Sequence, residues 1–404
     1  MEQTEQYQRI YNIRIWQPEI IFFKCCLNRI NNMIFNDKLP EEILVIICLS
    51  YIDLLLNYMK IYGGLKETLI MTKHGAIYLF SREKLAATLQ MNSSEEVNLP
   101  MPSNMLFDIN NLLPFVPKDI IDVHTGQGAH CLFLTKSSGL YGLGDNVYGQ
   151  LGIGPKGNPN TSYLEYINIQ NVISFVCGYD NSLVLTTNGL FGCGNNHCGQ
   201  LGLGDTVDRQ LFNKIDINNV ILFKCGMKHT LVLTNEGLFS CGANDKQQLG
   251  LIGTSDLFFT ILQKINISDV ISFSLGFGHT MVLIKNGMLL GCGCNKYWQL
   301  GSRPKPVAQG LFKIIDQIVY SVSCSSNITM FLSNYGLYRS GLALGELFQK
   351  IDLSDVIYFV CGYAHTLVLT KNGLFGCGLN GNMQLGVDDF NEKYVQTFKK
   401  INFD

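Results

Sequence analysis

The stretch Cys225–Gly242, CGMKHTLVLTNEGLFSCG, decides the fold because it contains two short alternating runs joined at a glycine. Close copies begin at Cys177 (CGYDNSLVLTTNGLFGCG), Leu275 (LGFGHTMVLIKNGMLLGCG) and Cys361 (CGYAHTLVLTKNGLFGCG). An apolar residue at every second position is typical of a strand with a buried face, and a glycine between two such runs predicts a hairpin. The chain therefore repeats one β-hairpin.

The repeated hairpin can be aligned on the glycine of its turn, and the most divergent copy lies at residues 65–80. The seven turn glycines are Gly75, Gly139, Gly189, Gly237, Gly287, Gly336 and Gly373. Asn-Gly pairs at several of these turns predict type I′ turns, in which the central residues have positive φ angles.

A second motif, Gln-Leu-Gly, follows five of the hairpins, at residues 150–152, 200–202, 248–250, 299–301 and 384–386. Further apolar runs come after it, such as FNKIDI and VILFKCG. Each unit thus supplies about four strands over roughly 50 residues, which is the size of a propeller blade.

These units predict an all-β fold, a seven-bladed β-propeller of four-stranded antiparallel blades over residues 59–404. The final FKKINFD resembles the start of other units but has no hairpin after it, and MKIYGGLKETLIM lies near the front. We expect one blade to be built from both ends of the chain, so that pairing of the N- and C-terminal strands closes the ring and protects its edges.

The hairpin pattern G-x-x-H-T-x-x-L and the loop pattern G-x-N-x-x-G-Q-L-G, here GCGNNHCGQLG from Gly192, resemble the regulator-of-chromosome-condensation repeat family. The resemblance covers about residue 60 to the end. It implies a seven-bladed propeller and, from the exchange factor of that family, guanine-nucleotide exchange on a Ran-like small GTPase. That exchange factor uses a β-hairpin wedge and a basic N-terminal tail. This chain has no basic tail, and its insertion at residues 81–111 shows little strand alternation.

Charge and composition exclude several classes of function. The formal net charge is −2 and there are no basic runs, which argues against a surface for nucleic acid or a polybasic membrane anchor. The N-terminus lacks the features of a signal peptide, and the apolar run at residues 43–52 is too short to span a bilayer. We expect an intracellular protein, cytoplasmic or nuclear, with no transmembrane segment, whose 14 cysteines are reduced and mostly buried.

One position, polar in six of the seven copies, recurs eight or nine residues before the turn glycine: Glu67, His130, Asn181, His229, His279, Ile328 and His365. Zinc needs ligands about 2 Å from one centre, whereas equivalent positions of different blades are far apart. We therefore expect these residues to be structural, with each histidine hydrogen-bonded to backbone within its own blade. The cysteine spacing predicts no zinc site and the glycine clusters no phosphate loop, so we expect no metal, no cofactor and no enzymatic activity.

Residues 1–58 lie outside the repeats and predict a helical segment. Within it, residues 37–57 resemble the opening of an F-box, which implies binding of a ubiquitin-ligase adaptor. The residues expected to contact that adaptor are Leu39, Pro40, Ile43, Leu44, Ile47 and Tyr51. The alternative is that these helices only cover the ring.

Two departures from symmetry could mark a binding site. The insertion at residues 81–111 contains Met91, Met101 and Met105, which suit an adaptable partner loop. The sixth unit is about ten residues short and lacks the Gln-Leu-Gly loop, which predicts a notch beside residues 302–310.

These features predict a non-enzymatic propeller that binds protein partners. With the F-box resemblance, the function would be a substrate receptor of a cullin-type ubiquitin ligase. The alternatives are an exchange factor for a Ran-like small GTPase and a structural protein that assembles with itself.

Overall fold

The computed structural model describes residues 60–64, 68–71, 77–80, 107–108, 120–126, 128–137, 139–155, 157, 159–301, 310–315, 317–341, 348–382, 384–385, 387 and 392–401. Within these residues the chain contains strands β1 to β28 and no helix. The strands form seven four-stranded sheets, and every pairing is antiparallel.

In chain order, the first two sheets hold β1 (Lys60–Gly63), β2 (Thr68–Met71), β3 (Ile77–Phe80) and β4 (Phe107–Asp108), then β5 (Ile120–Thr125), β6 (His130–Thr135), β7 (Leu140–Asp145) and β8 (Asn160–Ile167). The next two hold β9 (Val172–Cys177), β10 (Asn181–Thr186), β11 (Gly189–Gly194) and β12 (Arg209–Lys214), then β13 (Val220–Cys225), β14 (His229–Thr234), β15 (Gly237–Ala243) and β16 (Phe258–Lys264). The last three hold β17 (Val270–Leu275), β18 (His279–Ile284), β19 (Leu289–Gly293) and β20 (Phe312–Lys313), then β21 (Val319–Ser325), β22 (Ile328–Ser333), β23 (Gly336–Gly341) and β24 (Gln349–Ile351), and finally β25 (Val356–Cys361), β26 (His365–Thr370), β27 (Gly373–Leu379) and β28 (Tyr394–Ile401).

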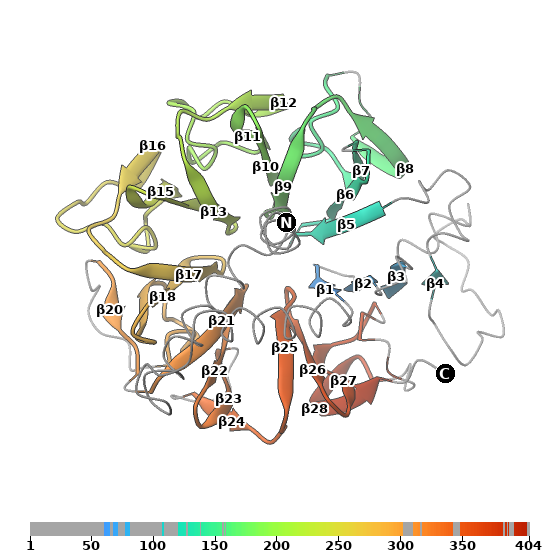
Figure 1. Ribbon diagram of the computed structural model, residues 1–404, viewed down its shortest axis with the longest axis vertical. Helices are drawn as coiled ribbons and strands as arrows, with labels where there is room; N and C mark the ends of the chain where they lie inside the picture. Colours follow the sequence, from blue (N-terminus) through green and yellow to red (C-terminus); the bar gives the residue numbers. More distant parts are fainter. Residues whose placement is uncertain are drawn as a thin grey trace, which may run out of the picture.

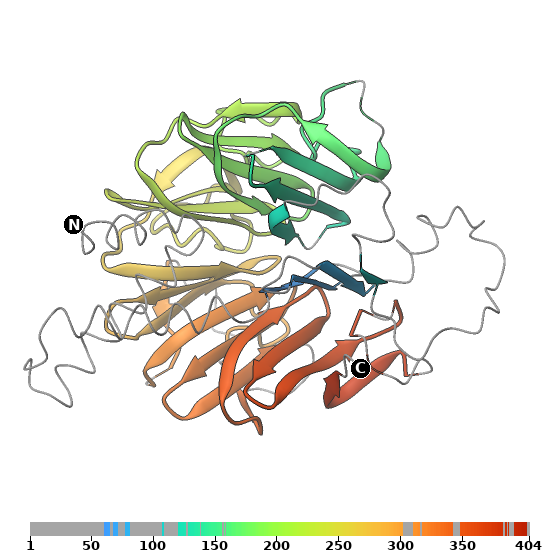
Figure 2. The same ribbon diagram turned by 45° about the vertical axis from the view of Figure 1, so that its right-hand side comes forward.

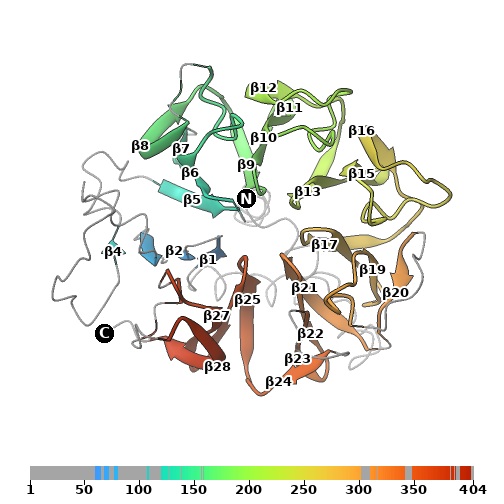
Figure 3. The ribbon, with the colours of Figure 1, turned by 180° about the vertical axis from the view of Figure 1, so that it is seen from behind.

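The sheets are arranged around a central axis, with the first strand of each sheet nearest the axis and the fourth at the rim (Figures 1 and 3). The predicted all-β propeller of four-stranded antiparallel blades is confirmed. The sheets from β5 to β28 are six regular blades, and the short sheet β1–β4 lies between the first and the last of them (Figure 2).

The prediction that one blade is shared by the two ends of the chain is wrong. The terminal strand β28 pairs with β27 at the rim of the last sheet, whereas β1 pairs with β2 at the axis. The last and first sheets meet side by side instead, where the Tyr363 amide donates to the Gly64 carbonyl at 3.1 Å. A repeating sequence does not reveal at which strand a blade begins, so the repeat could not decide this point.

The predicted type I′ turns are also wrong. In the β10–β11 hairpin, Thr186 pairs with Gly189, and positive φ occurs at Gly189 (122°) rather than at the two residues between them. The Thr186 hydroxyl accepts from the Asn188 amide at 3.0 Å and lies 3.3 Å from the Gly189 carbonyl. The threonine side chain therefore fixes the turn, and the following glycine supplies the positive φ.

The apolar core lies between neighbouring sheets. Leu132 and Leu151 of one sheet pack with Phe175 and Val184 of the next, and Ile61 of the first sheet packs with Leu367 of the last. Second strands such as β14 are buried at every residue, because both faces of the sheet are covered. These sheets thus bury their apolar side chains against their neighbours, which is the main source of stability in a repeat protein of this kind.

Buried histidines connect the sheets. His130 Nε2 lies 2.9 Å from Ser182 Oγ, His229 Nε2 lies 3.0 Å from Thr280 Oγ1, and His279 Nε2 lies 2.9 Å from Thr329 Oγ1. The same contact joins the last sheet to the first, where His365 Nε2 lies 3.0 Å from Thr68 Oγ1. We call these the histidine–hydroxyl contacts. The expectation that each histidine binds backbone within its own blade is therefore wrong, because the ring reaches the hydroxyl of the next blade.

The hydrogen-bond partners determine which histidine nitrogen carries the proton. Ser182 and Thr280 each donate their single hydroxyl hydrogen to a carbonyl, of Gln150 and Gln248 respectively, both at 2.7 Å. The hydroxyl must therefore accept from the histidine, so Nε2 of His130 and His229 is protonated. The glycine three residues before the histidine makes room for the ring, since a Cβ at Gly226 would lie 2.5 Å from Cε1 of His229.

The histidine–hydroxyl contacts are missing at two described interfaces. Asn181 replaces the histidine before Thr230. Its buried side-chain amide contacts the Cys225 thiol and has no other hydrogen-bond partner among the described residues. Ile328 replaces the histidine before Thr366 and joins an apolar cluster instead. Glu67 lies outside the described residues.

Replacing Thr68 by valine should destabilise the ring at its closing interface. The variant leaves the buried Nε2 of His365 without its hydrogen-bond partner, which costs about 1–3 kcal/mol. Thr366→Val is the matched control, since Thr366 holds the same strand position and faces no histidine. We expect urea unfolding to show a clearly larger loss for Thr68→Val, and equal losses would contradict the role of the contact.

Stability should fall as the pH decreases from about 7 to 5. Burial lowers the pKa of His229 and His365 from 6.5 to about 4, and that of His279 to about 3. The unfolded chain therefore binds protons first, so the free energy of unfolding is highest above pH 6.5 and declines toward the folded pKa values. Urea midpoints measured across this range should decrease steadily, and less steeply in His279→Gln. An unchanged midpoint would contradict the neutral, buried state of these rings.

Candidate functional site on the loop face

One side of the ring is formed by two kinds of connection, those between the first and second strands and those between the third and fourth strands of each sheet. The first and third strands of an antiparallel sheet run in the same direction, so both kinds of connection lie at the same end of the sheet. Backbone hydrogen bonds join them, as from the Asn195 amide to the Asp180 carbonyl at 2.8 Å and from the Cys294 amide to the Gly278 carbonyl at 2.7 Å. We call this side the loop face. The hairpin turns lie on the opposite side.

The Gln-Leu-Gly motif shapes the outer connections of the loop face. Asn196 Oδ1 accepts from the Leu201 amide at 2.9 Å, Gln200 Oε1 accepts from the Cys198 amide at 2.9 Å, and the Leu201 side chain is fully buried. The same contacts recur around Asn146, Asn244, Asn295 and Asn380. The motif therefore stabilises the conformation of the loop.

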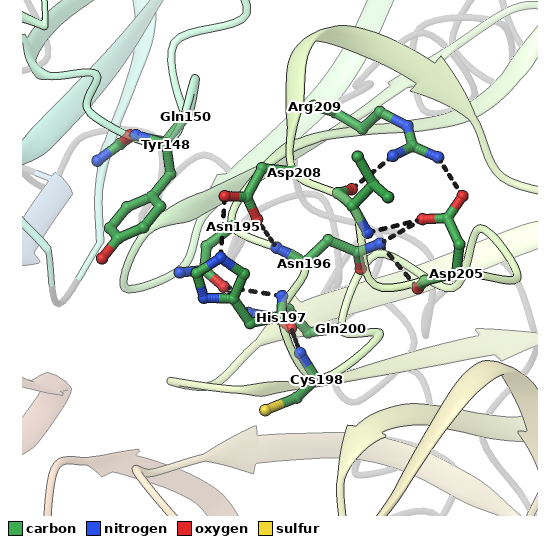
Figure 4. Close-up of polar contacts among 11 residues, drawn as sticks. Tyr148, Gln150, Asn195, Asn196, His197, Cys198, Gln200, Asp205, Asp208 and Arg209 are labelled. Carbon is green, nitrogen blue, oxygen red and sulfur yellow. Dashed lines mark hydrogen bonds and ion pairs between the residues drawn. The ribbon is translucent and has the colours of Figure 1, made fainter.

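The β11–β12 connection carries further polar contacts on this face (Figure 4). Asp208 accepts from the Asn196 amide at 2.7 Å and lies 3.2 Å from His197 Nε2. Arg209 forms an ion pair of 2.6 Å with Asp205, and its hydrogen bond lowers the pKa of that carboxyl. Tyr148 of the preceding sheet meets the His197 ring edge-on at 5.7 Å. These contacts hold the connection in one shape.

Three aromatic rings meet at the centre of the loop face. Phe277 lies 5.6 Å from Tyr179 and 5.3 Å from Tyr363, centroid to centroid. They follow strands β17, β9 and β25 respectively, and the sheet of β17 is separated by one sheet from that of β9 and by one sheet from that of β25. Rings from such sheets can touch only near the axis. We call these residues the central aromatic cluster; each ring is partly exposed.

Asp180 lies beside the central aromatic cluster and has an unusual environment. Its side chain is half-buried, and its carboxylate forms no hydrogen bond or ion pair with another residue that the structure describes. Burial first, and then the charges of Asp145 and Asp208, raise the pKa of this carboxyl to about 6, while the charge of Lys228 opposes them. An unpaired, partly desolvated carboxylate is costly, and such groups concentrate at functional sites.

The described cysteines are free, and most are buried. Burial raises the pKa of thiols such as Cys193 and Cys292, which keeps them protonated and unreactive. Cys193 and Cys292 lie 3.4 Å from the Gln150 and Gln248 carbonyls, so they support the same loops as the histidine–hydroxyl contacts. The small, buried role predicted for these cysteines is confirmed within the described residues.

The other predicted positions divide into two groups. Of the repeat positions, the described histidines and Asn181 lie between sheets, and in the described part of the chain no group of three or more His, Cys, Asp or Glu side chains is placed to hold a metal ion. The adaptor-binding residues, the three methionines of the partner loop and residues 302–309 beside the notch lie outside the described residues. No helix long and apolar enough to cross a membrane occurs among the described residues.

Sequence reasoning missed the central aromatic cluster and Asp180. The available signal was the pair of residues after the glycine in the G-x-x-H pattern, which reads Tyr-Asp in one copy and begins with an aromatic residue in two others. Nothing in a linear repeat shows that these positions from alternate units meet at one point.

Solved structures with a similar fold include human WBSCR16, at 22% identity, with a TM-score of 0.63 over 72% of this chain and 84% of that chain. Prp20p from Saccharomyces cerevisiae, whose binding to Gsp1p and histones was studied with its structure, is 19% identical, with a TM-score of 0.66 over 87% of this chain and 88% of that chain. Yeast RCC1 (Prp20), solved bound to Kap60, gives 20% identity and a TM-score of 0.62 over 71% of this chain and 77% of that chain. Likeness at these identities shows the fold alone.

Family comparison agrees with the hairpin analysis. Residues 172–200, 188–233 and 356–384 match the Regulator of chromosome condensation (RCC1) repeat. The chain is thus a β-propeller that contains RCC1 repeats.

Proposed function

We propose that this protein is a non-enzymatic propeller that binds a protein partner on its loop face. The central aromatic cluster carries this proposal. Aromatic side chains that are rigid and partly exposed contribute much of the affinity at protein interfaces. The backbone fixes these rings, since the Phe277 amide donates to the Ser326 carbonyl at 2.8 Å and the Tyr363 amide donates to the Gly64 carbonyl. Little ordering would be needed on binding.

We further propose that residues 59–404 act as one ring in which the short sheet β1–β4 is the seventh blade. Contacts on both sides of that sheet support this count. Thr68 meets His365 of the last sheet, and the Tyr62 hydroxyl donates to Asp122 of the second sheet at 2.9 Å. Residues 1–58 would then be a separate helical segment, and the protein would act inside the cell.

A photo-crosslinker at the centre of the loop face should capture the partner. With p-benzoylphenylalanine in place of Phe277, we expect a discrete cross-linked product in extracts of cells that express the protein, and excess unmodified protein should compete it away. Mass spectrometry of the product identifies the partner.

The matched control for this experiment carries the same crosslinker in place of Tyr335. That side chain is 60% exposed and lies at a hairpin turn on the opposite side. It should give no such product. Equal capture at both positions, or capture only at Tyr335, would show that the loop face is not the binding side.

A second proposal concerns what the propeller does with its partner. The F-box-like residues 37–57 would bind a ubiquitin-ligase adaptor and the loop face would hold the substrate, with Met91, Met101 and Met105 as an additional contact loop. The sequence pattern around Leu39 and Pro40 supports this proposal. Exchange on a Ran-like GTPase is the alternative suggested by the fold shared with Prp20p, whose binding to Gsp1p was studied. Self-assembly is a third.

Copurification with the adaptor should be lost in a Leu44→Asp, Ile47→Asp variant, because charges on the apolar side of the predicted helix would prevent its docking. Circular dichroism should show that the propeller remains folded. Absence of any adaptor from the wild-type preparation would remove the ligase proposal. Accelerated GDP release from a Ran-like GTPase, or defined oligomers at higher concentration, would favour the two alternatives respectively.

A further inference from the structure

The central aromatic cluster presents ring surfaces that are not stacked on one another. The Tyr179 and Phe277 planes meet at 84° and the Phe277 and Tyr363 planes at 60°, so the contacts run from edge to face. The hydroxyl groups of Tyr179 and Tyr363 form no hydrogen bond with another described residue. The faces of aromatic rings carry partial negative charge, which attracts cations.

Three acidic side chains and one lysine lie beside the cluster, so acidic charge, which has the same sign as the ring faces, is in excess there. Asp180 is next to Tyr179 in the chain, and its charge contributes to the raised pKa of the Tyr179 hydroxyl, after burial. Asp145 and Asp208 lie near enough to act on Asp180, and only Lys228 opposes them. Asp145 and Asp208 already accept backbone amides, from Val147 at 3.1 Å and from Asn196, whereas Asp180 has no such partner.

We infer that the centre of the loop face binds an arginine or lysine side chain from a basic segment of the partner protein, between the central aromatic cluster and the Asp180 carboxylate. The inference rests on the proposed protein-binding role and names the chemistry of the partner. A cation there gains attraction from the ring faces and a charge-assisted hydrogen bond to Asp180. It also relieves a carboxylate that is partly desolvated and unpaired.

An arginine fits this site better than a lysine. A guanidinium group is planar, so it can lie on an aromatic ring while its N–H groups point at a carboxylate. An acidic segment would meet the charges of Asp145, Asp180 and Asp208, and an uncharged one would leave Asp180 without a partner. A free metal ion is a poorer match, since the described residues hold no set of three metal-ligating side chains.

The test uses fluorescein-labelled peptides of about ten residues, built from glycine and serine with two arginines, and identical peptides with citrulline in place of arginine. Citrulline keeps the shape and removes the charge. Fluorescence anisotropy in about 50 mM salt limits screening. We expect the citrulline peptide to bind about tenfold more weakly, which corresponds to about 1.4 kcal/mol. We expect Asp180→Asn and Phe277→Leu each to weaken the arginine peptide by about three- to tenfold.

Glu236→Gln is the matched control, because Glu236 is an exposed acid at the β14–β15 hairpin turn on the opposite side. It should bind the arginine peptide as the wild type does. Equal affinity for the arginine and citrulline peptides, wild-type affinity in Asp180→Asn, or no binding of either peptide would each overturn the inference. Thermal unfolding of Asp180→Asn checks that its fold is intact.

The cross-linking experiment separates this inference from the proposed function. If the partner still cross-links at position 277 in an Asp180→Asn background with undiminished yield, the loop face binds protein but does not select a cation there. If position 277 captures nothing while the arginine peptide binds as expected, the cation site stands and the proposed protein-binding role fails.

Discussion

The sheets from β5 to β28 bury apolar side chains against neighbouring sheets, and this packing between sheets holds the described part of the propeller together. A sheet with two apolar faces cannot stand at the end of a row, so the row must close. Closure here occurs by side-by-side contact, with Ile61 in the apolar cluster of the last sheet and Thr68 on His365. The histidine–hydroxyl contacts make this packing more specific, because His130 and His229 donate to hydroxyls that have already given their own hydrogen to a carbonyl.

The same contacts connect the core to the loop face. The hydroxyls of Ser182 and Thr280, which accept from histidine, donate to the carbonyls of Gln150 and Gln248 in the Gln-Leu-Gly loops. The side chain of each of these glutamines in turn fixes its loop, as Gln150 Oε1 does by accepting from the Tyr148 amide at 3.0 Å. Hydrogen bonds from buried side chains therefore hold the connections of the loop face in place, and these fixed connections surround the central aromatic cluster. Preorganisation of this kind lowers the entropy lost on binding.

Differences between the repeats distinguish one part of the ring from another, as a binding site requires. Asn181 and Ile328 replace histidines and leave two interfaces without the contact, while Asp180 and the aromatic residues vary at positions that face solvent. If the repeats were identical, every blade would present the same surface, and a partner would bind no blade in preference to another. Tyr179, Phe277, Tyr363 and Asp180, whose carboxylate has no hydrogen-bond partner among the described residues, distinguish one place on the ring, and it is there that we propose a basic partner binds.

The hairpins, the four strands of each unit and the propeller fold could be predicted from the sequence, because alternation and turn glycines are local signals. The sequence also predicted that cysteines such as Cys193 would be small buried residues. The way in which the last sheet meets the first could be seen only in the folded protein, since a repeat does not indicate where a blade starts. The folded protein also showed that the histidines reach the next blade and that Tyr179, Phe277 and Tyr363 meet. Those contacts join residues that are tens of residues or more apart, and they depend on the radius and order of the ring, which no local pattern encodes.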